Sequence, residues 1–204
     1  MKLVLMEFVS LDGVSQGPGS PDEDTSGGFT RGGWFVPFVD AAFMQTVTKW
    51  IEAADAFLFG RRTYEAFAAH WPTVTDPGDA VANKLNGVPK YVVSKSLRDA
   101  NWNPTTLLSK DVAAQVAQIK RQPGREIQIH GSALLGHSLI QEGLVDEVRL
   151  AVAPVVVGQG RKLFRDGGAP LGFKLIRHET TSAGLAIHTY QAAGTATFGT
   201  YGAV

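Results

Sequence analysis

Residues 55–72 of the chain read DAFLFGRRTYEAFAAHWP, and this stretch predicts a buried strand, a glycine turn and a helix. The apolar run over 56–59 has the length of a strand covered on both faces. Gly60 ends the run at a point where the backbone can turn or a ligand can approach closely. The helix over 61–71 then stops before a proline, so the stretch predicts one strand–turn–helix unit.

The start of that helix is a candidate phosphate site. Arg61, Arg62 and Thr63 occupy its first positions. A helix N-terminus presents N–H groups without intrahelical partners and the positive end of the helix dipole. Two guanidinium groups and a hydroxyl beside it suit a phosphate group. From this segment alone, an ordinary junction with solvated arginines is an equally open interpretation.

Composition excludes several classes of protein. A chain of 204 residues indicates one domain, and a hydrophobic fraction of 44% can bury a sizeable core. The formal net charge of zero gives no reason to expect nucleic acid or an anionic membrane as partner. No apolar run reaches the roughly 18 residues of a membrane span, and Glu7 comes too early for a signal-peptide core. The chain has no cysteine, and we expect a cytoplasmic protein without a metal site.

A long segment over 13–33, rich in glycine, proline and acids, follows a predicted strand over 2–10. A loop of this length in a compact domain is usually functional or disordered. Aromatic residues among glycines at its end suit a lid over a ligand, and a surface loop pinned by Phe29 and Trp34 is the alternative. The lid interpretation makes Trp34, Phe38 and Asp40 candidate substrate-binding residues.

The remaining pattern predicts an α/β fold. Asp40 can cap a helix over 41–54, and residues 73–87 are polar and are expected to form a loop. Strands that alternate with helices before a terminal hairpin predict three layers: a central, mainly parallel sheet with an antiparallel C-terminal hairpin, and helices on both faces. Further strands are predicted over 89–94, 105–108, 126–130 and 146–153, helices over 111–121 and 133–142, and the hairpin over 173–179 and 185–191. The domain then spans residues 1–193, and 194–204 form a tail.

Polar residues follow three of the predicted strands, at 60–63, 94–95 and 131–132. Ligands of parallel sheets bind beyond the carboxyl ends of the strands. The three segments would line one cleft with arginines, a lysine, hydroxyls and free N–H groups, which suits a ligand with several phosphates such as a dinucleotide. The chain has neither a Walker motif nor the complete Rossmann glycine fingerprint.

Six motifs occur in order: SLDG (10–13), GRRTYE (60–65), YVVS (91–94), GSALL (131–135), LVDE (144–147) and PVVVGQGRKLF (154–164). Together they resemble the dihydrofolate reductase superfamily, and more closely its branch related to the C-terminal reductase domain of the bifunctional riboflavin-biosynthesis deaminase/reductase. The resemblance covers roughly residues 1–192. It implies a dihydrofolate-reductase-like fold, NADPH as cofactor and a homodimer.

The resemblance also implies roles for individual residues. Arg61 would meet the 2′-phosphate of NADPH, and Asp12 would lie near the transferred hydride as the catalytic acid. The other implied cofactor contacts are Gly60, Arg62 and Thr63 at the pyrophosphate, Ser94 and Lys95 at the adenine, Gly131, Ser132, Ala133, Leu134 and Leu135 toward the nicotinamide, and Val9 and Ser10 beneath it.

The chain departs from dihydrofolate reductases in one functional respect. Their pterin-binding acid lies on the helix that corresponds to residues 41–54, and here that helix has an apolar face of Phe43, Met44, Val47, Trp50 and Ile51. Without a buried acid, protonation of a pterin ring nitrogen lacks its donor. The chain also lacks the zinc-binding deaminase half of the riboflavin enzyme.

These observations favour an NADPH-dependent reductase of a small heterocyclic or ribosylamino-type substrate, with the proton from Asp12 or water. A catalytically silent NADP(H)-binding module and a pterin reductase are the alternatives. His130 at a strand end either lines the cleft or is structural. We expect a homodimer because the face of Val148, Leu150 and Val152, with the terminal hairpin, leaves a sheet edge that needs cover.

Overall fold

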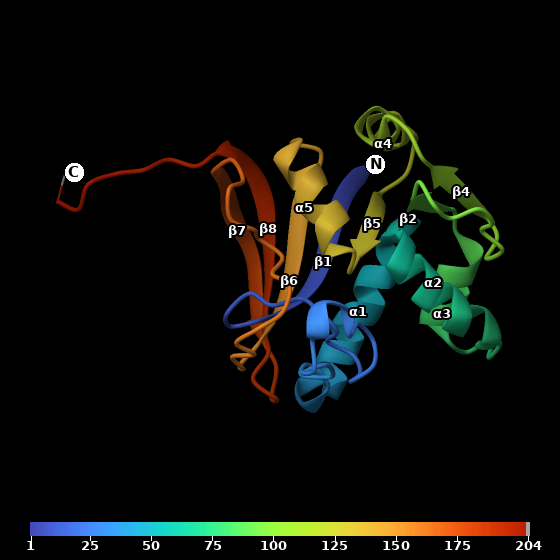
Figure 1. The fold of residues 1–204 in the computed structure, drawn as a ribbon, viewed down its shortest axis with the longest axis horizontal. Coiled ribbons are helices and arrows are strands. Elements are labelled where there is room, and N and C mark those ends of the chain that lie inside the picture. Colours follow the sequence, from blue (N-terminus) through green and yellow to red (C-terminus); the bar gives the residue numbers. More distant parts are fainter. Residues whose placement is uncertain (203–204) are drawn as a thin grey trace.

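A single eight-stranded sheet organises the computed structural model, which describes residues 1–202 (Figure 1). Its strand order is β4-β3-β2-β5-β1-β6-β8-β7. The six strands from β4 to β6 run parallel, and β8 and β7 add an antiparallel hairpin at one edge. The strands are β1 (Lys2–Ser10), β2 (Ala54–Gly60), β3 (Lys90–Val93), β4 (Thr105–Leu108), β5 (Glu126–His130), β6 (Glu147–Ala153), β7 (Leu171–Thr180) and β8 (Ala186–Thr195).

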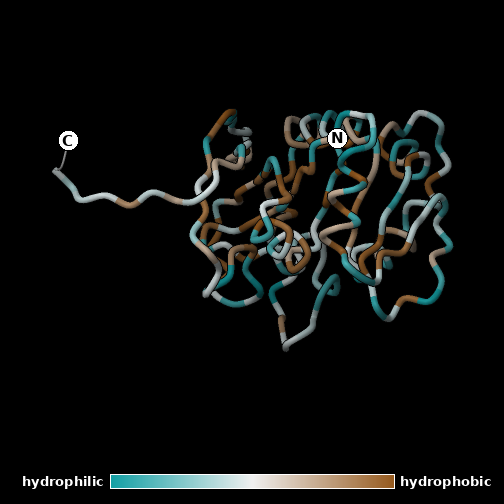
Figure 2. The backbone as a smooth tube through the Cα atoms, turned by 90° about the horizontal axis from the view of Figure 1, so that it is seen from above, coloured by the Kyte–Doolittle hydropathy of each residue, from teal (hydrophilic) through white to brown (hydrophobic). Residues whose placement is uncertain are grey.

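Helices cover both faces of this sheet. One face packs against α4 (Val112–Lys120) and α5 (Ala133–Gln141), which bury Leu3, Leu5 and Ile129 almost completely. The other face packs against α1 (Ala41–Ala53), α2 (Arg61–His70) and α3 (Ala80–Gly87). Hydrophobic residues concentrate on the central strands between these layers (Figure 2). The predicted three-layer α/β fold, with its mainly parallel sheet and C-terminal hairpin, is confirmed.

The polar stretch over 73–87 contains a helix, so the prediction of a loop there was wrong. Asp79 caps α3, because its carboxylate accepts the N–H of Ala82 at 2.9 Å. Leu85 faces the core and is 1% exposed. The helix is eight residues long and follows a proline–glycine pair, so its two buried residues were too few to show a helical period.

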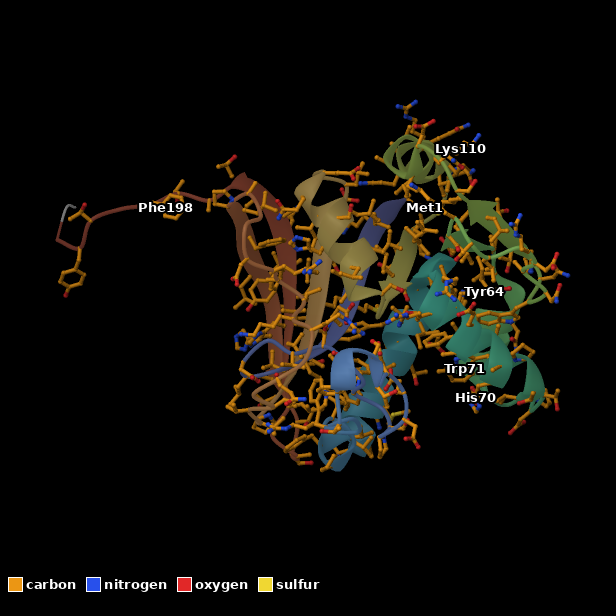
Figure 3. All side chains as sticks on the ribbon, in the orientation of Figure 1. Met1, Tyr64, His70, Trp71, Lys110 and Phe198 are labelled. Atoms are coloured by element: carbon orange, nitrogen blue, oxygen red, sulfur yellow. The ribbon has the colours of Figure 1, made fainter. Side chains whose placement is uncertain are left out.

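The C-terminal hairpin is longer than predicted. β8 continues to Thr195, two residues into the segment expected to be a tail. Residues 196–202 extend away from the sheet, and Phe198 on this segment is 84% exposed (Figure 3). The last two residues of the predicted tail, 203–204, lie outside the described residues. Within residues 1–202, every helix is too short or too polar to cross a lipid bilayer.

Candidate functional site

The two strand–glycine–helix junctions predicted from sequence lie in contact. Ser132, at the start of α5, accepts the backbone N–H of Gly60 at 2.9 Å and donates to Oγ1 of Thr63 at 2.8 Å. Gly131 and Ser132 both have positive φ, at 53° and 58°. This left-handed pair turns the chain sharply from β5 into α5. One hydroxyl therefore fixes the start of α5 against the start of α2.

Neither of these helices is capped by a side chain. Gly60 is the N-cap of α2 and Ser132 that of α5, and neither makes a side-chain cap hydrogen bond. The first-turn N–H groups of both helices are thus left for another partner. Two positive dipole ends meet at this point, which makes it suitable for an anion.

A cleft of about 1730 Å³ opens at these two helix starts. It contains Gly60, Arg61, Arg62 and Thr63 together with the segment 131–135, so the structure brings these predicted site residues together. An apolar arm of the cleft lies beside α1. It is lined by Phe35, Val36, Val39, Phe43, Met44 and Val47.

The arginines of α2 already have partners. Arg61 pairs with Glu65 one turn along, at 3.1 Å, and both side chains are about half exposed. Arg62 donates to Oγ of Ser26 at 3.1 Å and lies 3.6 Å from the carboxylate of Asp24. Exposed pairs of this kind contribute little to stability and exchange easily.

Asp24 and Ser26 tie the long loop over 13–33 to the wall of the cleft. Arg161 pairs with Asp24 and donates to Oγ of Ser26 at 2.7 Å, so two arginines share both loop groups. Burial opposes ionisation of Asp24, but the hydrogen bonds from Ser26 and the charge of Arg161 hold its pKa below the usual value. The loop thus places a carboxylate between two cations of the cleft.

The aromatic residues of this loop pack into the hydrophobic core. Phe29 and Trp34 are 2% and 9% exposed, and the indole N–H of Trp34 donates to the carbonyl of Gln16 at 2.8 Å. Phe38 packs against the same cluster of buried residues. The predicted substrate contacts of Trp34 and Phe38 are therefore corrected, since neither lines the cleft. A pinned loop is the better interpretation of these aromatic residues.

Asp40 is the N-cap of α1 and does not line the cleft. It accepts the N–H of Phe43 at 2.8 Å, and its second oxygen accepts the hydroxyl of Ser182 and the N–H of Ala183. These hydrogen bonds lower the pKa of Asp40 to about 2, and the bond from the N–H of Phe43 has the largest effect. The prediction of a cap is confirmed, and the predicted substrate contact does not fit this geometry.

The predicted catalytic role of Asp12 also does not fit. Asp12 accepts the hydroxyl of Ser10 at 2.6 Å and the backbone N–H groups of Val157 and Gly158 at 3.0 and 2.8 Å. These bonds, that of Ser10 first, lower the pKa of Asp12 to about 2, so it is a carboxylate at neutral pH. Val9 and Ser10 are buried, and none of the residues 9, 10 and 12 lines the cleft.

The two residues that follow β3 do not line the cleft, although the sequence predicted that they would. Ser94 is 8% exposed, and its hydroxyl accepts the N–H groups of Ser96 and Leu97 at 3.2 and 2.9 Å. It therefore closes a local turn. Lys95 is exposed, and neither residue is part of the cleft lining.

His130 both lines the cleft and belongs to a buried polar chain. Its Nε2 lies 2.9 Å from Oε1 of Gln128, which bonds in turn to Glu126, the ion-pair partner of Arg149. Burial, and secondarily the charge of Arg149, lowers the pKa of His130 to about 3. The ring is therefore neutral at physiological pH.

Sequence reasoning missed Glu7, an acid that lines the cleft. It lies in the middle of β1, is 4% exposed and lines the cavity. Burial, and secondarily the negative charge of Glu23, raises the pKa of Glu7 well above 4.5. The available signal was an isolated acid within the otherwise apolar strand LVLMEFV.

Comparison with known proteins identifies a family whose model matches this chain. A family model described as the RibD C-terminal domain matches residues 1–187. The uncharacterized protein YyaP of Bacillus subtilis is 27% identical over 186 residues, which are 90% of this chain and 91% of YyaP.

Two of the solved structures that share the fold are enzymes of known type. The diaminohydroxyphosphoribosylaminopyrimidine deaminase/5-amino-6-(5-phosphoribosylamino)uracil reductase of Thermotoga maritima matches 94% of this chain and 56% of its own, at 12% identity and a TM-score of 0.62. Dihydrofolate reductase of Enterococcus faecalis, complexed with NADP(H), matches 94% of this chain and 96% of its own, at 12% identity and a TM-score of 0.58. On the match over residues 1–187, the chain belongs to the RibD C-terminal domain family.

Proposed function

We propose that this protein is an NADPH-dependent reductase of a small heterocyclic or ribosylamino-type substrate. The observation that carries the proposal is the meeting of two uncapped helix starts, joined through Ser132, beside Arg61 and Arg62. Free N–H groups and guanidinium groups are the donors that a pyrophosphate needs. The NADP(H) complex of the E. faecalis enzyme, which has the same fold, supports this choice of cofactor.

The size of the cleft supports two ligands. A drug-sized ligand occupies a cavity of roughly 300–1,000 Å³, and this cleft measures about 1730 Å³. The polar end at Gly60–Thr63 would hold the dinucleotide. The apolar arm with Phe35, Val39 and Phe43 would take a flat ring and exclude water from it.

NADPH would supply a hydride. The protein would position the substrate and bind the negatively charged phosphate groups of the cofactor. In this arrangement Arg61 would exchange its exposed partner Glu65 for the 2′-phosphate, which it can bind in bidentate fashion. Arg62 would turn from Asp24 to the pyrophosphate. NADPH is therefore preferred over NADH.

The test combines binding with turnover. Fluorescence titration of the protein with NADPH and NADH should show tighter binding of NADPH. Oxidation of NADPH, followed by absorbance, should then occur with at least one member of a panel of ribosylaminopyrimidines, pterins and simple carbonyl compounds. Equal binding of the two dinucleotides, or no binding of either, would contradict the proposal.

A silent NADP(H)-binding module is the second candidate. The ionised and fully bonded state of Asp12 favours it, because the expected proton donor is then missing. Tight binding of NADPH without turnover of any compound in the panel would support this second candidate.

A further inference from the structure

Glu7 is a buried acid of the cleft with a carboxyl oxygen that makes no hydrogen bond within residues 1–202. Its Oε1 is buried and, among residues 1–202, makes no hydrogen bond to a protein group. The residue lies opposite Leu150 in the neighbouring strand and is 4% exposed. Asp12, Asp24 and Asp40 all accept several hydrogen bonds from the protein.

An unpartnered buried carboxyl group is costly for the fold. Transfer of an isolated carboxylate from water to an apolar site is so unfavourable that the group takes up a proton instead. Even as a neutral acid, a buried oxygen without a hydrogen bond destabilises the folded state. A group that costs stability and faces a large cleft is a candidate for a ligand contact.

The cleft contains other charged groups besides this acid. The loop contributes Glu23, α2 contributes Arg61 and Arg62, and α5 contributes His137, whose Nδ1 is also buried without a partner within the described chain. The remaining charged or titratable lining groups are Asp24, His130, Glu142, Arg161, Lys162, Arg165 and Asp166. Glu23 is the neighbour whose charge further opposes ionisation of Glu7.

We propose that Glu7 is the acid that binds the polar edge of the substrate and gives it a proton. This inference rests on the proposed reductase function. A neutral carboxyl group donates through its O–H and accepts through its second oxygen, so it matches an amide or amidine edge of a heterocycle. Because Glu23 lies nearby, the position disfavours a carboxylate or phosphate of the substrate.

The chemical step balances with the groups named. The carbon of a C=N or C=O bond gains the hydride of the dihydronicotinamide, and the nitrogen or oxygen gains the proton of Glu7. The bond is thereby reduced by two electrons while the cofactor is oxidised. Glu7 is left as a carboxylate, and its burial beside Glu23 favours the uptake of a proton from water.

Kinetics of matched variants test the proposal. Glu7→Gln keeps the shape and the hydrogen-bonding edge but has no proton to give, so we expect kcat to fall by about 100-fold or more. The Kd for NADPH should stay within about twofold of wild type. Glu52→Gln makes the same change at an exposed site on α1 and should leave kcat unchanged. Full kcat in Glu7→Gln would overturn the proposal.

A measurement on the wild-type protein separates this inference from the proposed function. The carboxyl ¹³C signal of Glu7, assigned by its absence in Glu7→Gln or Glu7→Leu, should titrate above 4.5. It should shift when 2,4-diaminopyrimidine or uracil is added, and not with benzoate. A signal that titrates normally, or that no probe moves, would overturn the role of Glu7 even if NADPH binds. A protein that does not bind NADPH, but whose Glu7 responds to the probes, would instead refute the reductase function.

Discussion

The protonation state of a carboxyl group in this protein depends on where the group lies. Asp12 and Asp40 accept hydrogen bonds from backbone N–H groups, and both have a pKa of about 2. Glu7 has no such donor within residues 1–202, so burial, and secondarily the charge of Glu23, raises its pKa. Asp12 and Asp40, which local sequence marked as functional, have structural roles, and the acid inside an apolar strand lines the cleft.

The raised pKa of Glu7 predicts how stability changes with pH. In the unfolded chain Glu7 ionises near 4.5, whereas the folded protein keeps its proton to higher pH. Rising pH therefore favours the unfolded state, by up to about 1.4 kcal/mol per pH unit between 4.5 and the folded pKa. Thermal unfolding should show Glu7→Gln gaining on wild type as pH rises from 4.5 to 8. A constant difference across this range would contradict the prediction.

The two arginines of α2 should have separable roles. Loss of one charge-assisted hydrogen bond costs on the order of 1.5–3 kcal/mol, or roughly ten- to hundredfold in affinity. Arg61→Ala should weaken NADPH by about this factor, reduced somewhat by the release of Glu65, and leave NADH nearly unchanged. Arg62→Ala should weaken both dinucleotides. If Arg61→Ala weakens the two equally in fluorescence titrations, Arg61 does not contact the 2′-phosphate.

If the cleft binds NADPH, Asp24 competes with its phosphate groups for Arg62 and Arg161. Its carboxylate lies 3.6 Å from Arg62 and also pairs with Arg161. Asp24→Asn removes the charge but keeps the side-chain shape, and exposed ion pairs are worth about 0.2–1 kcal/mol. We expect NADPH to bind up to about fivefold more tightly to this variant, as measured by titration. Weaker binding would mean that Asp24 orients the arginines for the cofactor.

At the scale of elements, the strand–helix junctions were predictable because their signals are local. Gly60 and the pair Gly131–Ser132 each follow a predicted strand and precede a helix, and these neighbours in sequence are enough to place them. The contact of Ser132 with Thr63 joins residues 69 positions apart, which no local pattern encodes. The same limit applies to the loop, whose tie from Arg161 to Asp24 spans 137 positions. The sequence thus predicted the elements and part of the cleft. It did not predict which side chains of the cleft are already bonded to distant residues.

Two substitutions of Ser132 test whether its hydroxyl stabilises the contact between the starts of α2 and α5. Ser132→Ala removes the acceptor of the Gly60 N–H and should destabilise the fold by about 1–3 kcal/mol in thermal or denaturant unfolding. Ser132→Gly loses the same bond but relieves the positive φ of 58°, so it should be less destabilising by about 0.4–1 kcal/mol. If both variants unfold like wild type, the hydroxyl does not hold the junction.

At the scale of the whole molecule, part of the reason first given for a homodimer was wrong. Val148 and Leu150 are 1% and 9% exposed, because they are buried within the core of their own chain. The edge on the hairpin side is instead β7, and β4 is the outermost strand at the other edge of the sheet. Leu175 and Ile176 on this strand are 45% and 48% exposed. A long edge strand with exposed apolar side chains is a common site of strand pairing between chains.

We therefore propose that two copies associate through β7, and light scattering after size-exclusion chromatography tests this. The expected mass at micromolar concentration is twice the 21.8 kDa of one chain. Leu175→Lys adds a charge to the exposed edge, where it would be buried without a partner in a dimer, and should give the monomer mass. Lys174 lies next to it in β7, and Lys174→Arg keeps the charge there and should leave the dimer intact. A wild-type mass of one chain would refute association, and a dimer that survives Leu175→Lys would place its interface elsewhere.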